Sequence, residues 1–115
     1  MPVFSLQFGI SYKHMFFLEN FFQILELMKG DNESWFLYVV HCSDDTLYTG
    51  VTTDVSRRIR EHNTGSRGAK YTKARRPVRL VYCIGFDNRS SAQKAEYKFK
   101  KLTRMKKNEV IFESR

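Results

Sequence analysis

Five side chains of this 115-residue sequence have the chemistry needed to break a phosphodiester bond. Two are phenols, Tyr38 and Tyr48, two are the cations or bases Arg58 and His62, and one is the carboxylate Glu96. An arginine can offset charge that grows on a phosphate, and a neutral imidazole can accept or donate a proton. A tyrosine acts as a base only where positive charge stabilises its phenolate. Each residue alone also fits an ordinary structural role, so the prediction of phosphodiester cleavage depends on their coming together.

Glu96 is the most informative of the five residues. It lies among Ala92, Ala95 and Phe99, near the apolar stripe of an expected helix, where a carboxylate is costly unless it is paired or bound to a cation. One candidate partner is Lys100, one turn later. The other is a divalent metal, and Mg²⁺ suits because it keeps several waters and often takes one or two carboxylates.

The two tyrosines fall on two β-like runs, residues 35–42 and 46–52, which predict a hairpin. A three-residue connection would pair Val40 with Tyr48 and would place Tyr38 on the same face of the sheet. A two-residue turn would place the phenols on opposite faces.

The helix after this hairpin carries Arg58 and His62 one turn apart. Asp54 is well placed to cap it, and Val55 and Ile59 mark the same face as His62. Gly50, just before this helix, lacks a Cβ and lets a ligand or a side chain approach closely.

The remaining pattern predicts a third strand at 78–86, central because it is apolar on both alternations, and two further helices. The sequence SSAQ at 90–93 has the spacing of a capping box, and the last helix covers 104–112. The order β-β-α-β-α-α predicts an α+β fold, a small three-stranded, mostly antiparallel sheet flanked by helices. The expected buried face of the fifth element is Ala92, Ala95, Phe99 and Leu102.

The polar break at 29–34 predicts a boundary between a leader, residues 1–34, a domain at 35–112 and a tail at 113–115. Apolar residues of the leader recur at helical spacing, so it is expected to be helical or partly disordered; a translation start at Met28 is the alternative. Its apolar part is too short to span a bilayer. Cys42 and Cys83 lack metal or redox spacing, which favours a reducing, cytoplasmic setting.

Positive charge is concentrated after the leader, and the net charge is +8. Between positions 57 and 107 only Glu61, Asp87 and Glu96 are acidic. Such a field attracts a polyanion, either nucleic acid or an anionic membrane, although solubility alone is the simpler explanation. The candidate nucleic-acid-binding residues are Arg57, Arg67, Lys70, Lys73, Arg75 and Arg76.

These features together resemble the GIY-YIG nuclease superfamily, in particular its small stand-alone members. FLY at 36–38 and YTG at 48–50 stand where the family has its two motifs, and KAEYK at 94–98 resembles the helix with the metal-binding glutamate. The resemblance covers about 35–112. It implies a single Mg²⁺ or Mn²⁺ ion on Glu96, Tyr48 or Tyr38 as base or water-positioning group, Arg58 on the phosphate and His62 in proton transfer.

The resemblance implies cleavage of DNA, and branched, nicked or single-stranded forms are favoured because so small a domain has little area for reading bases. RNA remains an alternative substrate, and a monomer or weak dimer is expected. A second hypothesis is a nucleic-acid-binding module without cleavage, and a third is a domain that docks through its leader helix. Covalent attack by a tyrosine ranks below metal-assisted hydrolysis.

Overall fold

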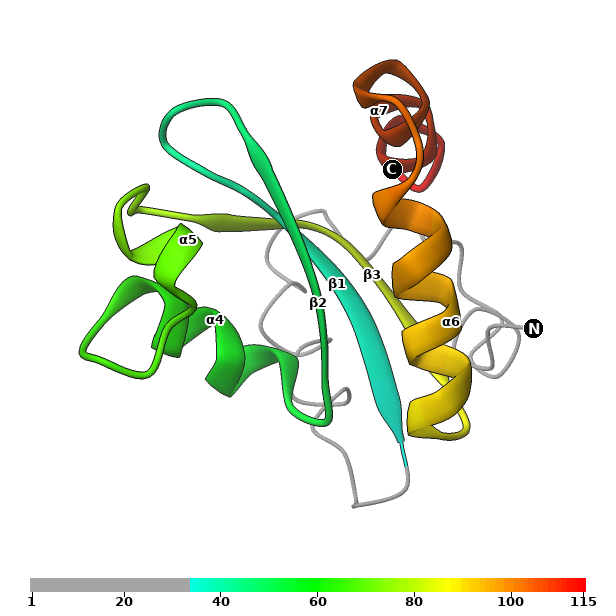
Figure 1. Ribbon diagram of the computed structural model, residues 1–115, viewed down its shortest axis with the longest axis horizontal. Coiled ribbons are helices and arrows are strands. Elements are labelled where there is room, and N and C mark those ends of the chain that lie inside the picture. Colours follow the sequence, from blue (N-terminus) through cyan, green and yellow to red (C-terminus); the bar gives the residue numbers. More distant parts are fainter. Residues whose placement is uncertain (1–33) are drawn as a thin grey trace.

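The computed structural model describes residues 34–115, which form a three-stranded sheet with two helices on each side (Figure 1). The expected leader helix lies outside the described residues. The elements, in chain order, are β1 (Trp35–His41), β2 (Leu47–Thr52), α4 (Val55–Asn63), α5 (Lys70–Lys73), β3 (Arg79–Phe86), α6 (Arg89–Lys100) and α7 (Arg104–Glu113). The α+β class and the order of the long elements are as predicted. The four-residue α5, between α4 and β3, was not predicted.

The strand order is β2-β1-β3 with both pairings antiparallel, so β1 is central. The prediction that the third strand is central was wrong. β1 is buried along almost its whole length. β3 lies at an edge, and it is apolar on both alternations because helices cover both faces of this sheet.

The β1–β2 hairpin has the three-residue connection and register that the sequence predicted. Val40 pairs with Tyr48 and Tyr38 pairs with Gly50, so both phenols lie on one face. Asp45 closes the turn with φ 70°, a left-handed conformation that Asp adopts more readily than most residues.

Alternate residues of the strands build two cores, one on each face of the sheet. The face under α4 buries Phe36, Tyr38, Val40, Cys42, Val55, Val78 and Cys83. The opposite face, under α6 and α7, buries Leu37, Val39, Val81, Ile84, Phe99 and Ile111. Neither cysteine forms a disulfide within residues 34–115, and burial raises the pKa of each thiol.

Side chains cap the long helices at their N-termini. Asp54 accepts from the Arg57 amide at 3.0 Å, as predicted. α6 begins after Asn88, which accepts from the Ser91 amide at 2.8 Å, so Ser90 lies inside the helix and the predicted capping box was wrong. Asn88 has the extended backbone that an N-cap needs.

None of the helices between residues 34 and 115 has the length and apolar character needed to cross a bilayer.

Candidate active site

A chain of three hydrogen bonds runs inward from Tyr38. Its hydroxyl lies 2.7 Å from Nε2 of His62, and Nδ1 of that ring lies 2.8 Å from Oγ1 of Thr72. The Thr72 hydroxyl donates to the Ala69 carbonyl at 2.9 Å, so its oxygen accepts a hydrogen bond from Nδ1–H. The Ala69 amide also approaches Nδ1, but only to 3.4 Å, which is the weaker contact. Nε2 therefore carries a lone pair and accepts the hydrogen of the Tyr38 hydroxyl.

Burial controls the protonation of this pair. Tyr38 is 1% exposed and His62 is 0% exposed. Burial, followed by the nearby Arg58 charge, lowers the pKa of His62 to about 4, so the imidazole is neutral at pH 7. Burial also raises the pKa of Tyr38, opposed by a hydrogen bond from Arg58. Tyr38 is thus a neutral phenol that donates to His62 and accepts from Arg58.

Gly50 makes room for the Tyr38 hydroxyl. A Cβ at position 50 would lie 2.5 Å from that oxygen and 2.7 Å from Cζ of the ring. Such distances are far inside van der Waals contact, so any larger residue would displace the phenol. The glycine in the second sequence motif therefore serves the tyrosine of the first motif, across the strand pair.

Tyr48 is less buried than Tyr38, and contacts of its ring with other rings hold the side chain in place. The ring packs edge-on against His62 with centroids 5.2 Å apart, and stacks on Tyr71 at 5.9 Å. Arg75 closes the stack, with its guanidinium 3.8 Å from the Tyr71 ring centroid. The Tyr48 hydroxyl makes no hydrogen bond to any residue of 34–115, so it remains available to a ligand or water.

Arg58 lies at the rim of this site, half-buried. Its Nη1 donates to Glu61 Oε1 and to the Arg67 carbonyl, both at 2.9 Å. Burial would lower the pKa of the guanidinium, but its hydrogen bonds to Glu61 and Tyr38 reverse this and raise it. These bonds fix the side chain and leave other N–H groups free for a phosphate.

Glu96 approaches the site from the helix on the other side of the sheet, α6, which packs on the edge strand β2 as well as on β1. Its side chain is 21% exposed, and Lys100 Nζ, one of its two candidate partners, lies 3.1 Å from Oε2. Its negative charge is also one of the causes that raise the pKa of Tyr38, so the carboxylate acts electrostatically on the phenol.

A divalent ion fits this single carboxylate only as a hydrated ion. Among residues 34–115 no three His, Cys, Asp or Glu side chains gather closely enough to form a full metal cage. Mg²⁺ does not need a cage, since it usually keeps several waters and binds through one or two carboxylates. A half-buried Glu96 whose charge acts on Tyr38 suits that mode of binding.

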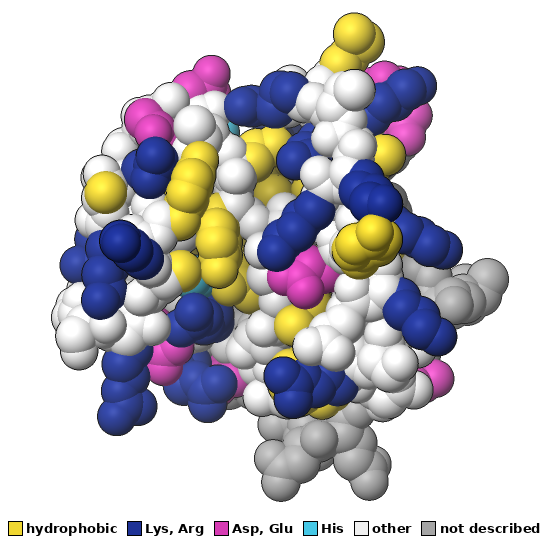
Figure 2. Space-filling model, viewed as in Figure 1, with side chains coloured by type: hydrophobic (Ala, Val, Ile, Leu, Met, Phe, Trp, Pro, Cys, Tyr) yellow, Lys and Arg dark blue, Asp and Glu magenta, His cyan; other side chains and the backbone are white. Residues whose placement is uncertain are grey.

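The six predicted nucleic-acid-binding residues fall into two groups. Arg57, Arg67, Lys70 and Lys73 are exposed. Arg75 and Arg76 are half-buried and donate to the protein: Arg75 Nε bonds Asp44 Oδ2 at 2.9 Å, and Arg76 Nε bonds the His62 carbonyl at 2.7 Å. Figure 2 shows Lys and Arg side chains framing one face, with hydrophobic and acidic side chains between them.

Sequence reasoning missed two residues that support the site, Thr72 and Tyr71. Thr72 is fully buried and sets the tautomer of His62, and Tyr71 stacks on Tyr48. Both lie on the four-residue α5, which is too short to show a hydrophobic period.

A family model for the GIY-YIG catalytic domain matches residues 34–109. The chain belongs to the GIY-YIG family. This is a nuclease family whose members generally use divalent metal ions, so the membership points to a hydrolase that acts on nucleic acid.

Curated relatives of this GIY-YIG chain carry the name UPF0213. A UPF0213 protein of Desulfotalea psychrophila is 49% identical over 81 residues, which cover 70% of this chain and 74% of the relative. The UPF0213 protein YazA of Bacillus subtilis is 48% identical over 85 residues, 74% of this chain and 85% of the relative. A solution NMR structure of a UPF0213 protein from Bacillus halodurans is 44% identical, with a TM-score of 0.45, and covers 68% of this chain and 82% of that chain.

Proposed function

We propose that this GIY-YIG protein is a metal-dependent DNA endonuclease that hydrolyses phosphodiester bonds. The observation that supports it best is the shared face of Tyr38 and Tyr48, with the Arg58 charge acting on Tyr38 and His62 and the Glu96 charge acting on Tyr38. A guanidinium, phenols and a carboxylate in one electropositive place match the needs of phosphodiester hydrolysis.

In this proposal Tyr48, rather than Tyr38, contacts the attacking water. Tyr38 has almost no exposed surface, and its hydroxyl already donates to His62. The Tyr48 hydroxyl is free within the described chain and lies nearer the surface. Tyr48 orients the water, and to accept its proton as well it would need positive charge that stabilises the phenolate.

Arg58 binds the scissile phosphate in this scheme. Its Nη1 is anchored on Glu61 and the Arg67 carbonyl, so its remaining N–H groups have little freedom and can form a two-pronged contact to phosphate oxygens. The same group offsets the charge that grows in the transition state.

Tyr38 and His62 are positioning residues in this scheme. His62 has no exposed surface and reaches the reaction only through Tyr38. Their hydrogen bond, fixed by Thr72, holds the phenol oxygen where it can accept from Arg58. His62 thus sets the position of the guanidinium rather than touching substrate.

Glu96 would hold the divalent ion, and Mg²⁺ or Mn²⁺ fits a site with one carboxylate. When bound, the ion supplies Lewis-acid polarisation of the phosphate and stabilises the leaving oxygen. Lys100, its present partner, would move away or help to neutralise the phosphate.

The proposal extends to substrate and setting. The exposed Arg57, Arg67, Lys70 and Lys73 would bind DNA backbone, and so small a domain favours branched, nicked or single-stranded DNA, as in repair or recombination. Two buried cysteines that form no disulfide in the described part of the chain suit the cytoplasm. A monomer or weak dimer suffices for cutting one strand.

A second candidate function is a DNA-binding module without cleavage. The ion pairs at Arg58 and Glu96 favour it, since both groups have protein partners. Incubation with supercoiled, branched and single-stranded DNA, with Mg²⁺, with Mn²⁺ and with chelator, separates the two. Metal-dependent products support the endonuclease; DNA that is shifted but intact under every metal condition contradicts it.

A further inference from the structure

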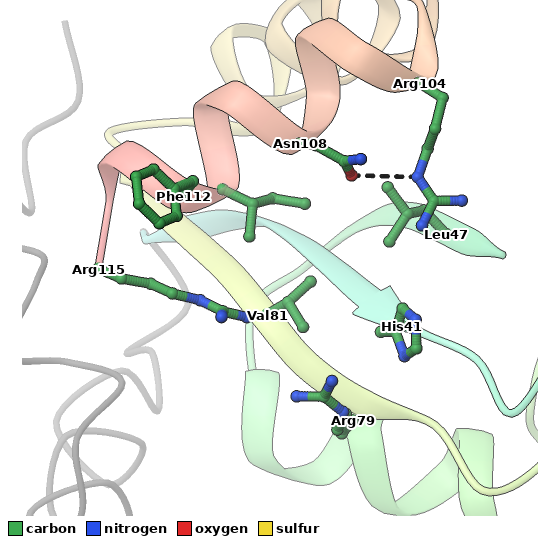
Figure 3. Close-up of a pocket in the computed structure, with 9 residues that line it drawn as sticks. His41, Leu47, Arg79, Val81, Arg104, Asn108, Phe112 and Arg115 are labelled. Atoms are coloured by element: carbon green, nitrogen blue, oxygen red, sulfur yellow. Dashed lines mark hydrogen bonds between the residues drawn. The ribbon is translucent and has the colours of Figure 1, made fainter. Parts of the chain in front are cut away.

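A second basic hollow lies under α7, on the sheet face opposite Tyr38 and Tyr48 (Figure 3). Its volume is about 240 Å³. The strand register places Leu47, His41 and Arg79 in one row across the end of the sheet, because His41 pairs with both of the others.

Two of the arginines that line this hollow have no carboxylate partner among residues 34–115. Arg79 and Arg115 line it, and neither forms an ion pair with a carboxylate of residues 34–115. Asn108 Oδ1 accepts from Arg104 Nε at 3.0 Å, which turns the amide so that its NH₂ group stays free to donate. Two guanidinium groups and one amide NH₂ therefore face a ligand rich in acceptor oxygens.

The Asp45 carboxylate does not cancel this charge. Asp45 lies at the edge of the hollow, where His41 Nε2 is 2.7 Å from its Oδ1 and Arg104 donates to its carbonyl at 2.7 Å. The hydrogen bond from His41, followed by the Arg104 charge, lowers the pKa of Asp45. Asp45 thus fixes His41 and Arg104 in place and leaves Arg79 and Arg115 uncompensated.

An apolar surface continues from the donors. Leu47, Val81 and Ile111 line the hollow, and the ring of Phe112, 75% exposed, stands at its rim beside Arg115 (Figure 3). Basic donors beside an exposed aromatic ring suit a ligand that joins a phosphate to a flat base, since bases stack on aromatic side chains. An acidic peptide would leave the ring unused.

We propose that this hollow binds one nucleotide unit of a single-stranded nucleic acid, with the phosphate on Arg79, Arg115 and Asn108 and the base against Phe112. Its volume is below the roughly 300–1,000 Å³ of drug-sized sites, which suits one unit of a longer chain. The inference rests on the proposed function for its choice of nucleic acid. It adds that the preferred DNA carries a single-stranded arm that reaches the face of the sheet opposite the tyrosines.

The test measures binding of a fluorescent oligothymidylate to the full chain in chelator, so that nothing is cut. The double variant Arg79→Ala with Arg115→Ala should bind about tenfold more weakly, and its salt slope should fall by about 0.7 because the contact to one phosphate is lost. The matched control, Lys106→Ala with Lys107→Ala, removes two charges from α7 outside the hollow and should stay within about threefold of wild type.

Two further measurements separate this site from simple charge attraction. Phe112→Ala should weaken binding of the oligonucleotide about fivefold or more, through lost stacking, and should not change the salt slope. In ¹H–¹⁵N spectra the side-chain NH₂ signal of Asn108 should shift on adding oligothymidylate and should not shift on adding polyglutamate.

Equal losses in the two double variants, or an unmoved Asn108 signal, would overturn the inference while leaving the endonuclease proposal intact. The same holds if wild type binds no single strand yet cuts duplex DNA. Conversely, if the protein cuts no DNA and still binds single strands through Arg79 and Arg115, the proposed nucleotide site is supported and the proposed endonuclease activity is contradicted.

Discussion

The Tyr38 hydroxyl lies only 2.5 Å from the position that a Cβ at residue 50 would take. The two residues are register partners across β1 and β2. The phenol can therefore reach Arg58 and His62 only over a glycine. The YTG and FLY motifs depend on each other physically, which their separation in sequence hides.

Replacing Gly50→Ala should lower the free energy of unfolding by about 1–3 kcal/mol, because the new methyl group displaces a buried ring. Tyr38→Leu frees that space, so in a double-mutant cycle the two changes should be non-additive by about 1 kcal/mol or more. Gly65→Ala is the control: it is strained by φ +68° but meets no atom within 4 Å. Additive energies for Gly50→Ala and Tyr38→Leu would contradict the contact.

The two tyrosines should respond differently to loss of the hydroxyl. Tyr48→Phe should lower single-turnover cutting at least about a hundredfold with unchanged stability, because only the contact to water is lost. Tyr38→Phe should lower unfolding free energy by about 1–3 kcal/mol, since His62 Nε2 loses its donor, and should slow cutting less. The reverse order of rates would assign the water to Tyr38.

His62 should make stability depend on pH. An unfolded histidine takes up its proton near pH 6.5, whereas folded His62 does so only near pH 4. Between these values the unfolded state binds more protons, so stability is full above pH 6.5 and falls by about 2–3 kcal/mol towards pH 4. Denaturant melts of His62→Gln over pH 7 to 4 should lack this part of the loss. Parallel curves for the two proteins would mean that His62 titrates normally.

Arg76 and Arg67 test which arginines serve the fold and which serve DNA. Arg76 donates to the carbonyls of His62 and Gly65, at 2.7 and 2.9 Å, near the end of α4, so Arg76→Ala should cost about 1–3 kcal/mol of stability. Arg67→Ala, at an exposed side chain, should change stability by less than about 0.5 kcal/mol and should lower DNA affinity and its salt slope. Equal effects of both changes on stability would refute this division.

Local chemistry explains which parts of the fold the sequence predicted well. The hairpin register follows from a three-residue connection and strand alternation, and Asp54 is a cap recognisable from its neighbours. The predicted strand order was wrong because strand order depends on non-local pairing. Apolar residues on both alternations of β3 show only that both faces of the strand are covered, and in this sheet that is true of the central strand and of the edge strand alike. The predicted capping box that begins at Ser90 was wrong because Asn88, two residues earlier, already caps the helix.

Residue type and order along the chain were enough to select the five candidate catalytic residues. The structure adds their hydrogen-bond partners and their burial, which sequence spacing does not indicate. Thr72 lies ten residues from His62, on a helix of one turn, and nothing in its neighbours indicates a buried hydroxyl. Whether Tyr38 or Tyr48 is open to water depends on burial, which both motifs leave undecided because the two residues share one sheet face.

The most direct test of the account is cutting by Glu96→Gln, compared with wild type and with Glu109→Gln, a carboxylate on α7 that pairs with Lys106 at 3.8 Å. The assay uses branched and single-stranded DNA in Mg²⁺ or Mn²⁺, with binding measured in parallel. We predict that Glu96→Gln loses at least about a hundredfold in cutting, because the carboxylate that would hold the metal is removed, and keeps its DNA affinity, because the exposed Lys and Arg side chains are unchanged. Glu109→Gln should cut as wild type does. Metal-dependent cutting that survives in Glu96→Gln would contradict the site proposed for this protein.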